Sequence, residues 1–262
     1  MKNFTIRIKF IFYFLLLLSA CAHAQPGKDG DVTITDVNTV LNRYTRAAVD
    51  IAAGSTTITV TNINDLNRNS PSYLPGGFVT NNSGFVSNVL SPGDLIIIYQ
   101  AQGASINNSD TMGYGSVTNY NGAGTYELVY VESVSGNTIT LSCETKMSYN
   151  VARYVQIIRV PQYNTITVNA AASIVAIPWG APSFGGADAS AIERRRGGFN
   201  AFFANNVINN GSINANNAGF RGGTIDNLTS AASAAFVSSF FSSLPQDGAE
   251  KGESIAGYRT DY

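Results

Sequence analysis

Apolar and polar residues alternate along much of the chain, which predicts short β-strands. In the stretch AAGSTTITVTNI, Thr57, Thr59 and Thr61 point one way while Ile58 and Val60 point the other. This period of two is typical of a half-buried strand. The stretch DVTITDVNTVLNRYTRAAVDI, before it, shows a shorter alternation of the same kind.

Three later stretches continue this pattern. Residues 95–99 (LIIIY) follow a Pro-Gly-Asp turn and form a continuous apolar run, which fits a buried strand. Residues 126–134 and 138–142 predict a hairpin joined through Ser-Gly-Asn, and ARYVQIIRVPQYNTITV supplies two more strands separated at Pro161. Six or more short strands without a convincing helix predict a β-sandwich or barrel over residues 26–163.

The pattern changes near residue 164. The segments ITVNAAASIVAIPWG and GGFNAFFANNVINNGSINANNAGFRGG contain strand pieces of three to five residues between Asn, Gly and Ala. Asn and Gly suit tight corners, so residues 164–262 predict the start of a right-handed parallel β-helix. Residues 235–244 predict one short amphipathic helix. A solenoid needs capped ends, and no cap is visible, so we expect this module to be truncated or covered by something else.

The first 24 residues predict a secretory signal peptide. A basic start leads into IFYFLLLLSA and then an Ala-His-Ala cleavage site, which would leave Gln25 first. The apolar run is too short for a membrane-spanning helix. Leu-Ser-Ala-Cys at residues 18–21 is also a well-formed lipobox, so lipidation of Cys21 and an outer-membrane lipoprotein stay open as the alternative.

Removal of the signal peptide excludes several kinds of chemistry. The mature chain would carry 13 basic and 17 acidic residues, a balance that does not favour binding to nucleic acid. It would lose His23, the single histidine, and with it any catalytic triad or histidine metal site. Cys143 would be the remaining thiol, so no internal disulfide can form. We therefore expect a protein that is not an enzyme and that has no cofactor.

Calcium is the one metal for which the sequence offers weak candidates. Asp65, Asn67 and Asn69 match the first half of an oxygen-ligand loop, but the glycine and the bidentate glutamate of such a loop are missing. Asp29 and Asp31 form a second acidic turn. Asx-rich, solvated turns are the favoured interpretation of both stretches.

Tyrosines supply the candidate ligand contacts. They are frequent in and around the first module, and a tyrosine combines an apolar ring with a polar tip suited to wet surfaces. The polar loop at 103–125 is the candidate carbohydrate face, with Tyr114 and Tyr120 as its exposed members. Strand tyrosines are also routine in β-sandwiches.

Several blocks of sequence, taken in order, resemble a known group of proteins. They are SPGDLIIIYQAQGASIN, YGSVTNYNGAGTYELVYVESVSGNTITLS, VQIIRVPQYNTITVN, NNGSINANNAGFRGG and GAEKGESIAGY. The chain resembles the N-terminal region of large secreted gliding-motility-associated or adhesin-like surface proteins of Bacteroidota. The resemblance implies export by the type IX secretion system, through a C-terminal sorting region that lies outside these 262 residues. It brings no active-site residues.

Together these features predict a non-catalytic, secreted, cell-surface protein with a role in adhesion or as a structural scaffold. Its partners would be surface glycans or other cell-surface proteins. The alternative is a carbohydrate-binding or carbohydrate-active module, in which a β-helix lyase or hydrolase would need a cluster of carboxylates or a cationic base on one face.

Overall fold

A computed structural model describes residues 27–70, 77–79, 84–109, 111–180, 195–220, 222 and 253–257. It is almost entirely β, which confirms the predicted fold class. Its strands are β1 (Val32–Ile34), β2 (Arg43–Arg46), β3 (Thr57–Thr59), β4 (Leu95–Gln100), β5 (Ser105–Ile106), β6 (Val117–Asn119), β7 (Tyr126–Ser135), β8 (Thr138–Leu141), β9 (Val155–Val160), β10 (Gln162–Val168), β11 (Ser173–Val175), β12 (Phe203–Asn209) and β13 (Ser212–Asn214). The described residues also form two short 3-10 helices, η1 (Ile63–Leu66) and η2 (Val151–Arg153). The helix predicted at 235–244 lies outside the described ranges.

Six antiparallel strands form a curled sheet, the half-barrel, in the order β2-β9-β4-β7-β8-β3. The sheet curls far enough that the ends of its two edge strands meet. Ala48 N donates to Thr59 O (2.8 Å), and Thr61 N donates to Arg46 O (2.9 Å). The concave side encloses an apolar core that includes Ile58, Ile96, Ile98, Val129, Val131, Ile139, Leu141 and Ile157.

The neighbouring strands β4 and β9 of the half-barrel are buried on both faces. On β4, Ile96 and Ile98 face the concave core, while Leu95 and Ile97 pack in a second cluster on the outer face. That second cluster also contains Val175 and Ile177, which come from the later part of the chain. The continuous apolar run at 95–99 is explained by this double burial, because neither face of β4 could be polar.

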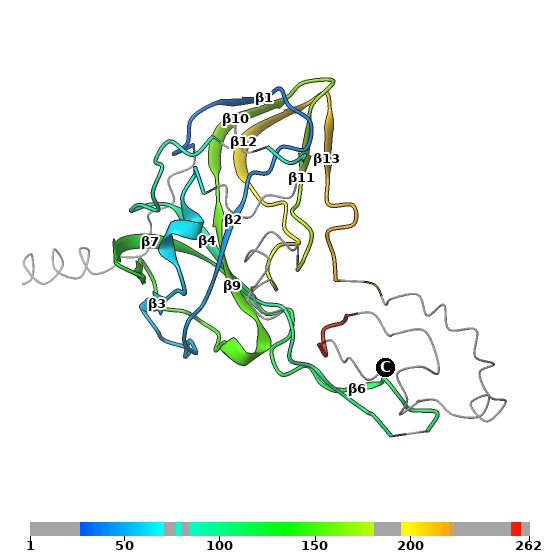
Figure 1. Cartoon of the computed structure of the whole chain (residues 1–262). Helices are drawn as coiled ribbons and strands as arrows, with labels where there is room; N and C mark the ends of the chain where they lie inside the picture. Colours follow the sequence, from blue (N-terminus) through cyan, green and yellow to red (C-terminus); the bar gives the residue numbers. More distant parts are fainter. Residues whose placement is uncertain are drawn as a thin grey trace, which may run out of the picture.

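Five further strands form a parallel stack, the coil stack, in which β1, β10 and β12 lie side by side and β11 pairs with β13 (Figure 1). Ile166 of β10 lies in register with Val32 below it and with Val207 above it. Coil 1 is residues 32–39, coil 2 is residues 162–175, and coil 3 is residues 203–214. Parallel, in-register strands joined at tight corners confirm the predicted β-helix.

The coil stack begins earlier in the chain than the sequence indicated. Residues 26–163 were expected to form one module, but β1 pairs with β10, and Thr39 bridges to Ile174 of coil 2. Residues 43–160, the half-barrel, are therefore inserted between coil 1 and coil 2. A short alternating strand can pair in parallel or antiparallel, so its own sequence did not determine which sheet it would join.

Residues 195–201 cross the outer face of the half-barrel and are held there by side chains. The Gln156 amide donates to Gly197 O (3.2 Å) and accepts from Gly197 N (3.0 Å). Asn42 binds Ala201 in the same two-way manner, at 2.7 and 2.8 Å. These buried amides satisfy backbone groups that no strand pairs, and they fix coil 3 against the half-barrel.

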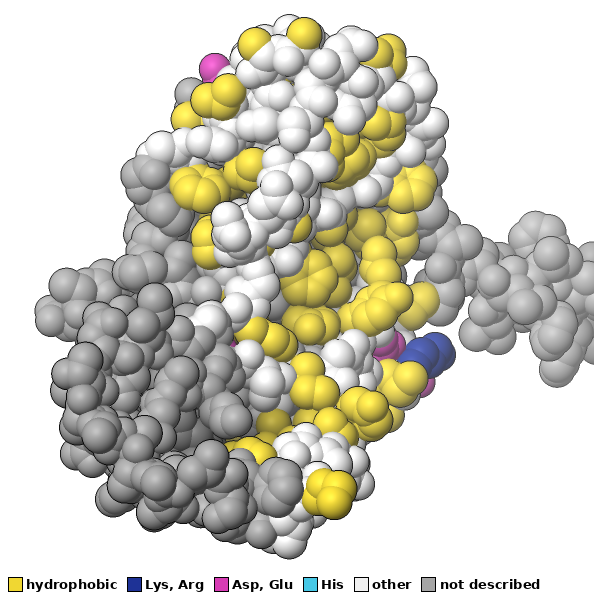
Figure 2. Space-filling model, turned by 90° about the vertical axis from the view of Figure 1, so that its right-hand side faces the viewer, with side chains coloured by type: hydrophobic (Ala, Val, Ile, Leu, Met, Phe, Trp, Pro, Cys, Tyr) yellow, Lys and Arg dark blue, Asp and Glu magenta, His cyan; other side chains and the backbone are white. Residues whose placement is uncertain are grey.

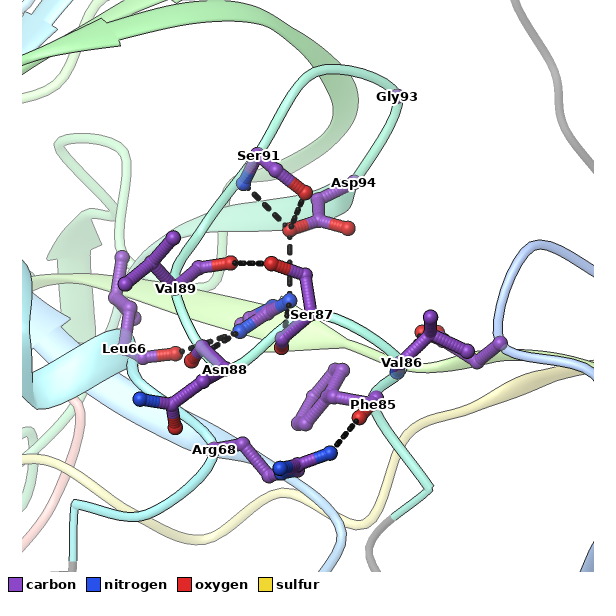
Figure 3. A network of polar contacts seen from close by, with 12 residues as sticks. Leu66, Arg68, Phe85, Val86, Ser87, Asn88, Val89, Ser91, Gly93 and Asp94 are labelled. Carbon is purple, nitrogen blue, oxygen red and sulfur yellow. Dashed lines mark hydrogen bonds and ion pairs between the residues drawn. The ribbon is translucent and has the colours of Figure 1, made fainter.

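Figure 3 shows the network of polar contacts around the loop that precedes β4, and a buried arginine of the half-barrel pairs with Asp94 of this loop. Arg159, on β9, is fully buried and forms an ion pair with the buried Asp94 at 2.8 Å. Its guanidinium also donates to the carbonyls of Leu66, Ser87 and Asn88 at 3.1 to 3.3 Å. Several charge-assisted bonds at once make burial of the charge tolerable.

A second buried arginine extends this network. Arg43, on β2, donates twice to Arg68 O, at 3.0 and 2.6 Å, and Arg68 in turn donates to Phe85 O at 2.8 Å. The Phe85 ring lies 4.1 Å from the Arg159 guanidinium and 5.8 Å from that of Arg43. The loop around Phe85 therefore depends on the two arginines of the sheet, and not on strand pairing.

Two buried tyrosines are expected to make the fold sensitive to alkaline pH. Burial, aided by the hydrogen bond that Tyr149 donates to Glu127 (2.9 Å), raises the pKa of Tyr149, and burial raises the pKa of Tyr163. Both phenols stay protonated in the folded chain at pH values where the unfolded chain titrates, near pH 10. Their stabilising contribution is thus fully present below about pH 10 and is lost as the pH rises, by up to about 1.4 kcal/mol per pH unit for each tyrosine.

Urea denaturation between about pH 8 and about pH 11.5 checks this expectation, because Tyr149→Phe should flatten the decline in unfolding free energy above about pH 10. Equal slopes for the wild type and for Tyr149→Phe would contradict it.

Candidate ligand-binding site

The outer face of the half-barrel carries a row of aromatic and apolar side chains at the β7 border. Tyr126, Leu128 and Tyr130 share one face of β7, because alternate residues of a strand point the same way. Tyr126 pairs directly with Tyr99 of β4, and Tyr99 packs edge-to-face on Phe199 with ring centroids 4.8 Å apart. We call these five residues, Tyr99, Tyr126, Leu128, Tyr130 and Phe199, the aromatic ledge.

Exposure of this face increases steadily toward β7. Ile158 of β9, Ile97 of β4 and Leu128 of β7 are lateral neighbours, and they are 0%, 6% and 55% exposed. The coil stack covers the β9 side, whereas β8 pairs only with the later half of β7, from Val131 onward. Tyr126, at the border, is 62% exposed.

Figure 2 shows hydrophobic side chains gathered in a band on one side of the molecule, below the neutral surface of the coil stack. Isolated exposed apolar residues are ordinary, but a continuous band beside a step in the surface is typical of a binding site. On the ledge, Phe199 of the covering segment is half-buried against the outer cluster, while Leu128 is 55% exposed.

The polar groups of the ledge are neutral. Burial raises the pKa of the Tyr99 phenol, so its hydroxyl remains a hydrogen-bond donor at physiological pH. Glu127 lies between Tyr126 and Leu128 in sequence but points to the concave side. Its carboxylate accepts hydrogen bonds from Lys146 N at 2.6 Å and from the Tyr149 hydroxyl at 2.9 Å. The five residues of the ledge thus offer aromatic surface and hydroxyls, and none of the five carries a carboxylate.

The structure places the tyrosines predicted as ligand contacts on a separate element. β5 and β6 form a two-stranded arm that extends from the body of the molecule (Figure 1). Tyr114 lies in the turn of this arm and is half-buried, and Tyr120 follows β6 and is 63% exposed. Both remain predicted contacts, on the arm and not on the sheet.

The first pair of calcium candidates lies where coil 1 meets coil 2. Asp29 is buried and accepts hydrogen bonds from Val86 N at 3.0 Å and Gln162 N at 2.8 Å. Burial raises the pKa of Asp29, against the effect of these two donors, which lower it. Asp31 is exposed and accepts a hydrogen bond from Thr165 N at 3.0 Å. Both carboxylates thus accept backbone hydrogen bonds that tie the start of coil 1 to neighbouring segments of the chain.

The second set of candidates lies at η1. Asp65 forms an ion pair with Arg196 at 2.6 Å, so its charge is already neutralised by the covering segment. The Asn67 amide donates to the Asn64 side chain at 3.2 Å, and Asn69 is exposed. Within the described ranges, no three His, Cys, Asp or Glu side chains come together as a metal site would require. Calcium binding stays a prediction.

The predicted signal peptide at residues 1–24, including the lipobox residue Cys21, lies outside the described residues. In the part of the chain that the structure describes, no helix has the length and apolar character needed to cross a membrane.

Comparison with known proteins yields no family assignment. No family model matches the chain, and no curated protein matches it. Among solved structures, the chain is similar to the Gp54 tailspike of Acinetobacter baumannii bacteriophage AP22, determined with a capsular saccharide, at 17% identity and a TM-score of 0.27. That likeness covers 56% of this chain and 22% of the tailspike.

Two further tailspikes show a similar partial likeness. Pseudomonas phage phi297 gp61 is 18% identical with a TM-score of 0.26, and covers 57% of this chain and 20% of its own length. Pseudomonas phage LKA1 gp49 is 13% identical with a TM-score of 0.25, and covers 56% of this chain and 24% of its own. The chain thus spans less than a quarter of each tailspike, and the coil stack is identified here by its own strand pairing.

The aromatic ledge was not singled out from the sequence. Its signal is visible in YELVYVESV, where Tyr126, Leu128 and Tyr130 alternate with Val129 and Val131, so both faces of one strand are apolar. A strand that is apolar on both faces either has both faces covered by other elements or carries an uncovered apolar face. Which face another element covers is a tertiary property, and for β7 the outer face stays exposed although the strand lies between β4 and β8.

Proposed function

We propose that this protein is a non-catalytic, secreted, cell-surface adhesion module that holds a neutral polysaccharide on the aromatic ledge. The observation that carries the proposal is the ledge itself, which combines exposed Tyr126 and Leu128 with the half-buried Tyr99, Tyr130 and Phe199.

The chemistry of the ledge favours a sugar chain over a charged ligand. The apolar C–H faces of a pyranose ring pack on aromatic rings, and its hydroxyls exchange hydrogen bonds with tyrosine hydroxyls. On a strand, Tyr126, Leu128 and Tyr130 follow one another at intervals of about 6.7 Å, which suits an extended ligand along β7. None of these side chains carries a charge, so an anionic polysaccharide gains no partner here.

Two observations favour binding of the polysaccharide over its hydrolysis. Glycoside hydrolysis by the common mechanisms needs two carboxyl groups on either side of one bond, and the carboxylate nearest in sequence, Glu127, points away and is already engaged. The mature chain predicted by cleavage after Ala24 also has no histidine. A carbohydrate-active module is the competing proposal.

Secretion, and the type IX secretion system as its route, belong to the same proposal. They are supported by the N-terminal signal pattern and by the sequence blocks that resemble adhesin-like surface proteins. An outer-membrane lipoprotein anchored through Cys21 is the alternative.

We expect Tyr126→Ala to weaken retention on a neutral polysaccharide by roughly tenfold, because loss of an aromatic contact of about 1.4 kcal/mol corresponds to that factor. Affinity electrophoresis of the secreted chain through gels containing neutral glucans, galactomannans or xylans measures it. Tyr120→Ala, an equally exposed tyrosine on the arm, is the matched control.

Three experimental outcomes would contradict the proposed function or the proposed position of the site. Loss of retention in Tyr120→Ala with none in Tyr126→Ala would move the site to the arm, as the sequence predicted. Release of new reducing ends from any of these glycans would replace adhesion by carbohydrate cleavage. Retention only on acidic polysaccharides would contradict a neutral ligand.

A further inference from the structure

We infer that the β12 end of the coil stack is a docking surface for another polypeptide coil, which adds a parallel strand onto β12 and a second onto β13. We call this surface the open coil face; it consists of the free edges of β12 and β13 together with Ala204, Val207, Asn209 and Ile213. This inference is independent of the aromatic ledge.

Equivalent positions in successive coils differ sharply in exposure. Ile166 in coil 2 is 0% exposed, whereas Val207, which stacks directly on it in coil 3, is 47% exposed. Ile174 in coil 2 is fully buried, and its partner Ile213 in coil 3 is only half-buried. These residues occupy the same inward positions, so the difference arises because no coil lies above coil 3 in the described part of the chain.

The backbone edges of coil 3 are also open in the part of the chain that the structure describes. Within the described residues, β12 pairs with β10 alone and β13 pairs with β11 alone. The opposite end of the stack is covered at the equivalent corner. Val79 bridges to Thr39 of coil 1, with hydrogen bonds from Val40 N to Val79 O at 2.9 Å and from Val79 N to Asn38 O at 3.1 Å. Unpaired strand edges recruit further strands. Among the described strands, β1 also pairs with β10 alone, but coil 1 is bridged at Thr39 and its inward residue Ile34 is fully buried, whereas the exposed Val207 marks the β12 end as the receptive one.

The geometry selects the kind of partner. β12 and β13 belong to one coil and are joined by the corner at Asn210 and Gly211, so a partner that pairs with both must follow the same path. A parallel coil does this, whereas a single antiparallel strand can satisfy only one of the two edges. Stacking on the open coil face thus continues the established pairing between coil 2 and coil 3.

The side chains specify the chemistry of that coil. β12 reads FANNVIN and β13 reads SIN, so neither strand carries a charge. Asn205 already donates to the Asn164 side chain below it at 3.4 Å, which begins an amide ladder between coils. The partner coil should therefore present a small apolar residue over Val207 and an asparagine over Asn205, and it should be uncharged.

A peptide of residues 203–214 (FANNVINNGSIN) is the probe, since its lower edge already pairs with a coil of this kind. We expect the fluorescently labelled peptide to bind the full chain, to slow hydrogen exchange in β12, and to bind at least tenfold more weakly to Val207→Lys. The control is Val117→Lys on the arm strand β6, where the valine is exposed to a similar extent, at 40%. Circular dichroism melting confirms that both variants remain folded.

A peptide of reversed sequence has the same composition but the wrong direction, so it should not bind. Binding of both peptides alike, binding that Val207→Lys leaves unchanged, or no binding of the forward peptide up to its solubility limit would each overturn the inference. Light scattering that finds a dimer of the wild type, lost in Val207→Lys, would also overturn it, by assigning the open coil face to a second copy of the chain.

Discussion

Asp94→Ala is expected to destabilise the fold by about 3–5 kcal/mol, the cost of leaving a buried charge without its partner. Asp94 and Arg159 are 2% and 0% exposed, and their ion pair measures 2.8 Å. Asp94 also accepts a hydrogen bond from Ser91 N at 2.8 Å, which closes the turn before β4. The substitution therefore removes both the counter-ion of Arg159 and the hydrogen bond that closes the turn before β4.

Urea denaturation of Asp94→Ala measures the change. Lys28→Ala is the matched control, because Lys28 contacts the same carboxylate but is partly exposed, and we expect a loss below about 1 kcal/mol. Adding Arg159→Met to Asp94→Ala should recover part of the stability, since the orphaned charge is then gone. A loss of less than about 1 kcal/mol in Asp94→Ala would show that water reaches Arg159 and that the network is not a buried one.

Gly211→Ala is expected to destabilise the coil stack by about 1–3 kcal/mol through a steric conflict at the corner between β12 and β13. A β-carbon at this position would lie 2.4 Å from Ala172 O and 2.4 Å from Asn169 O, both at the corresponding corner of coil 2. Such a contact is too short to persist, and both neighbours are backbone, so coil 3 would have to lift away from coil 2.

Gly219→Ala provides the control for this substitution, because a β-carbon there meets no atom within 4 Å. Hydrogen exchange should locate the damage, with faster exchange in β12 and β13 and unchanged exchange in the half-barrel strands β7 and β8. Uniform acceleration throughout the chain would contradict the idea that the corner acts locally. Equal stability of Gly211→Ala and Gly219→Ala would show that the corner of coil 3 accommodates the added β-carbon without a steric conflict.

A tight corner in the segment around Gly211 could be inferred from the sequence alone. Asn and Gly between short strand pieces indicated stacked coils, and Gly211 is a residue whose missing side chain lets two coils approach. The same reasoning did not reveal Asp94 as the centre of a network. Its partners Arg159 and Lys28 are far from it in sequence, and only the folded chain brings the three charges together.

The candidate site, too, could be predicted only in part from the sequence. The abundance of tyrosine drew attention to aromatic surface in the first module, and Tyr114 and Tyr120 of the polar loop remain predicted contacts. The ledge on β4 and β7 is a further candidate, and it could not be read from the sequence because Tyr99 and Tyr126 meet only when the two strands pair. Polarity along the chain cannot show which apolar face remains uncovered after folding.

The sequence by itself determined that this protein is all-β, that it contains both antiparallel strands and stacked parallel coils, and that residues 95–99 form a strand with an apolar run. These features depend on period, turn residues and composition, which are local. Only the tertiary structure decided that β1 joins the coil stack, that the half-barrel is inserted between two coils, and that the ledge and the open coil face lie open within the described residues. Those features depend on which edges and faces meet, and pairing between distant strands is set by the whole chain at once.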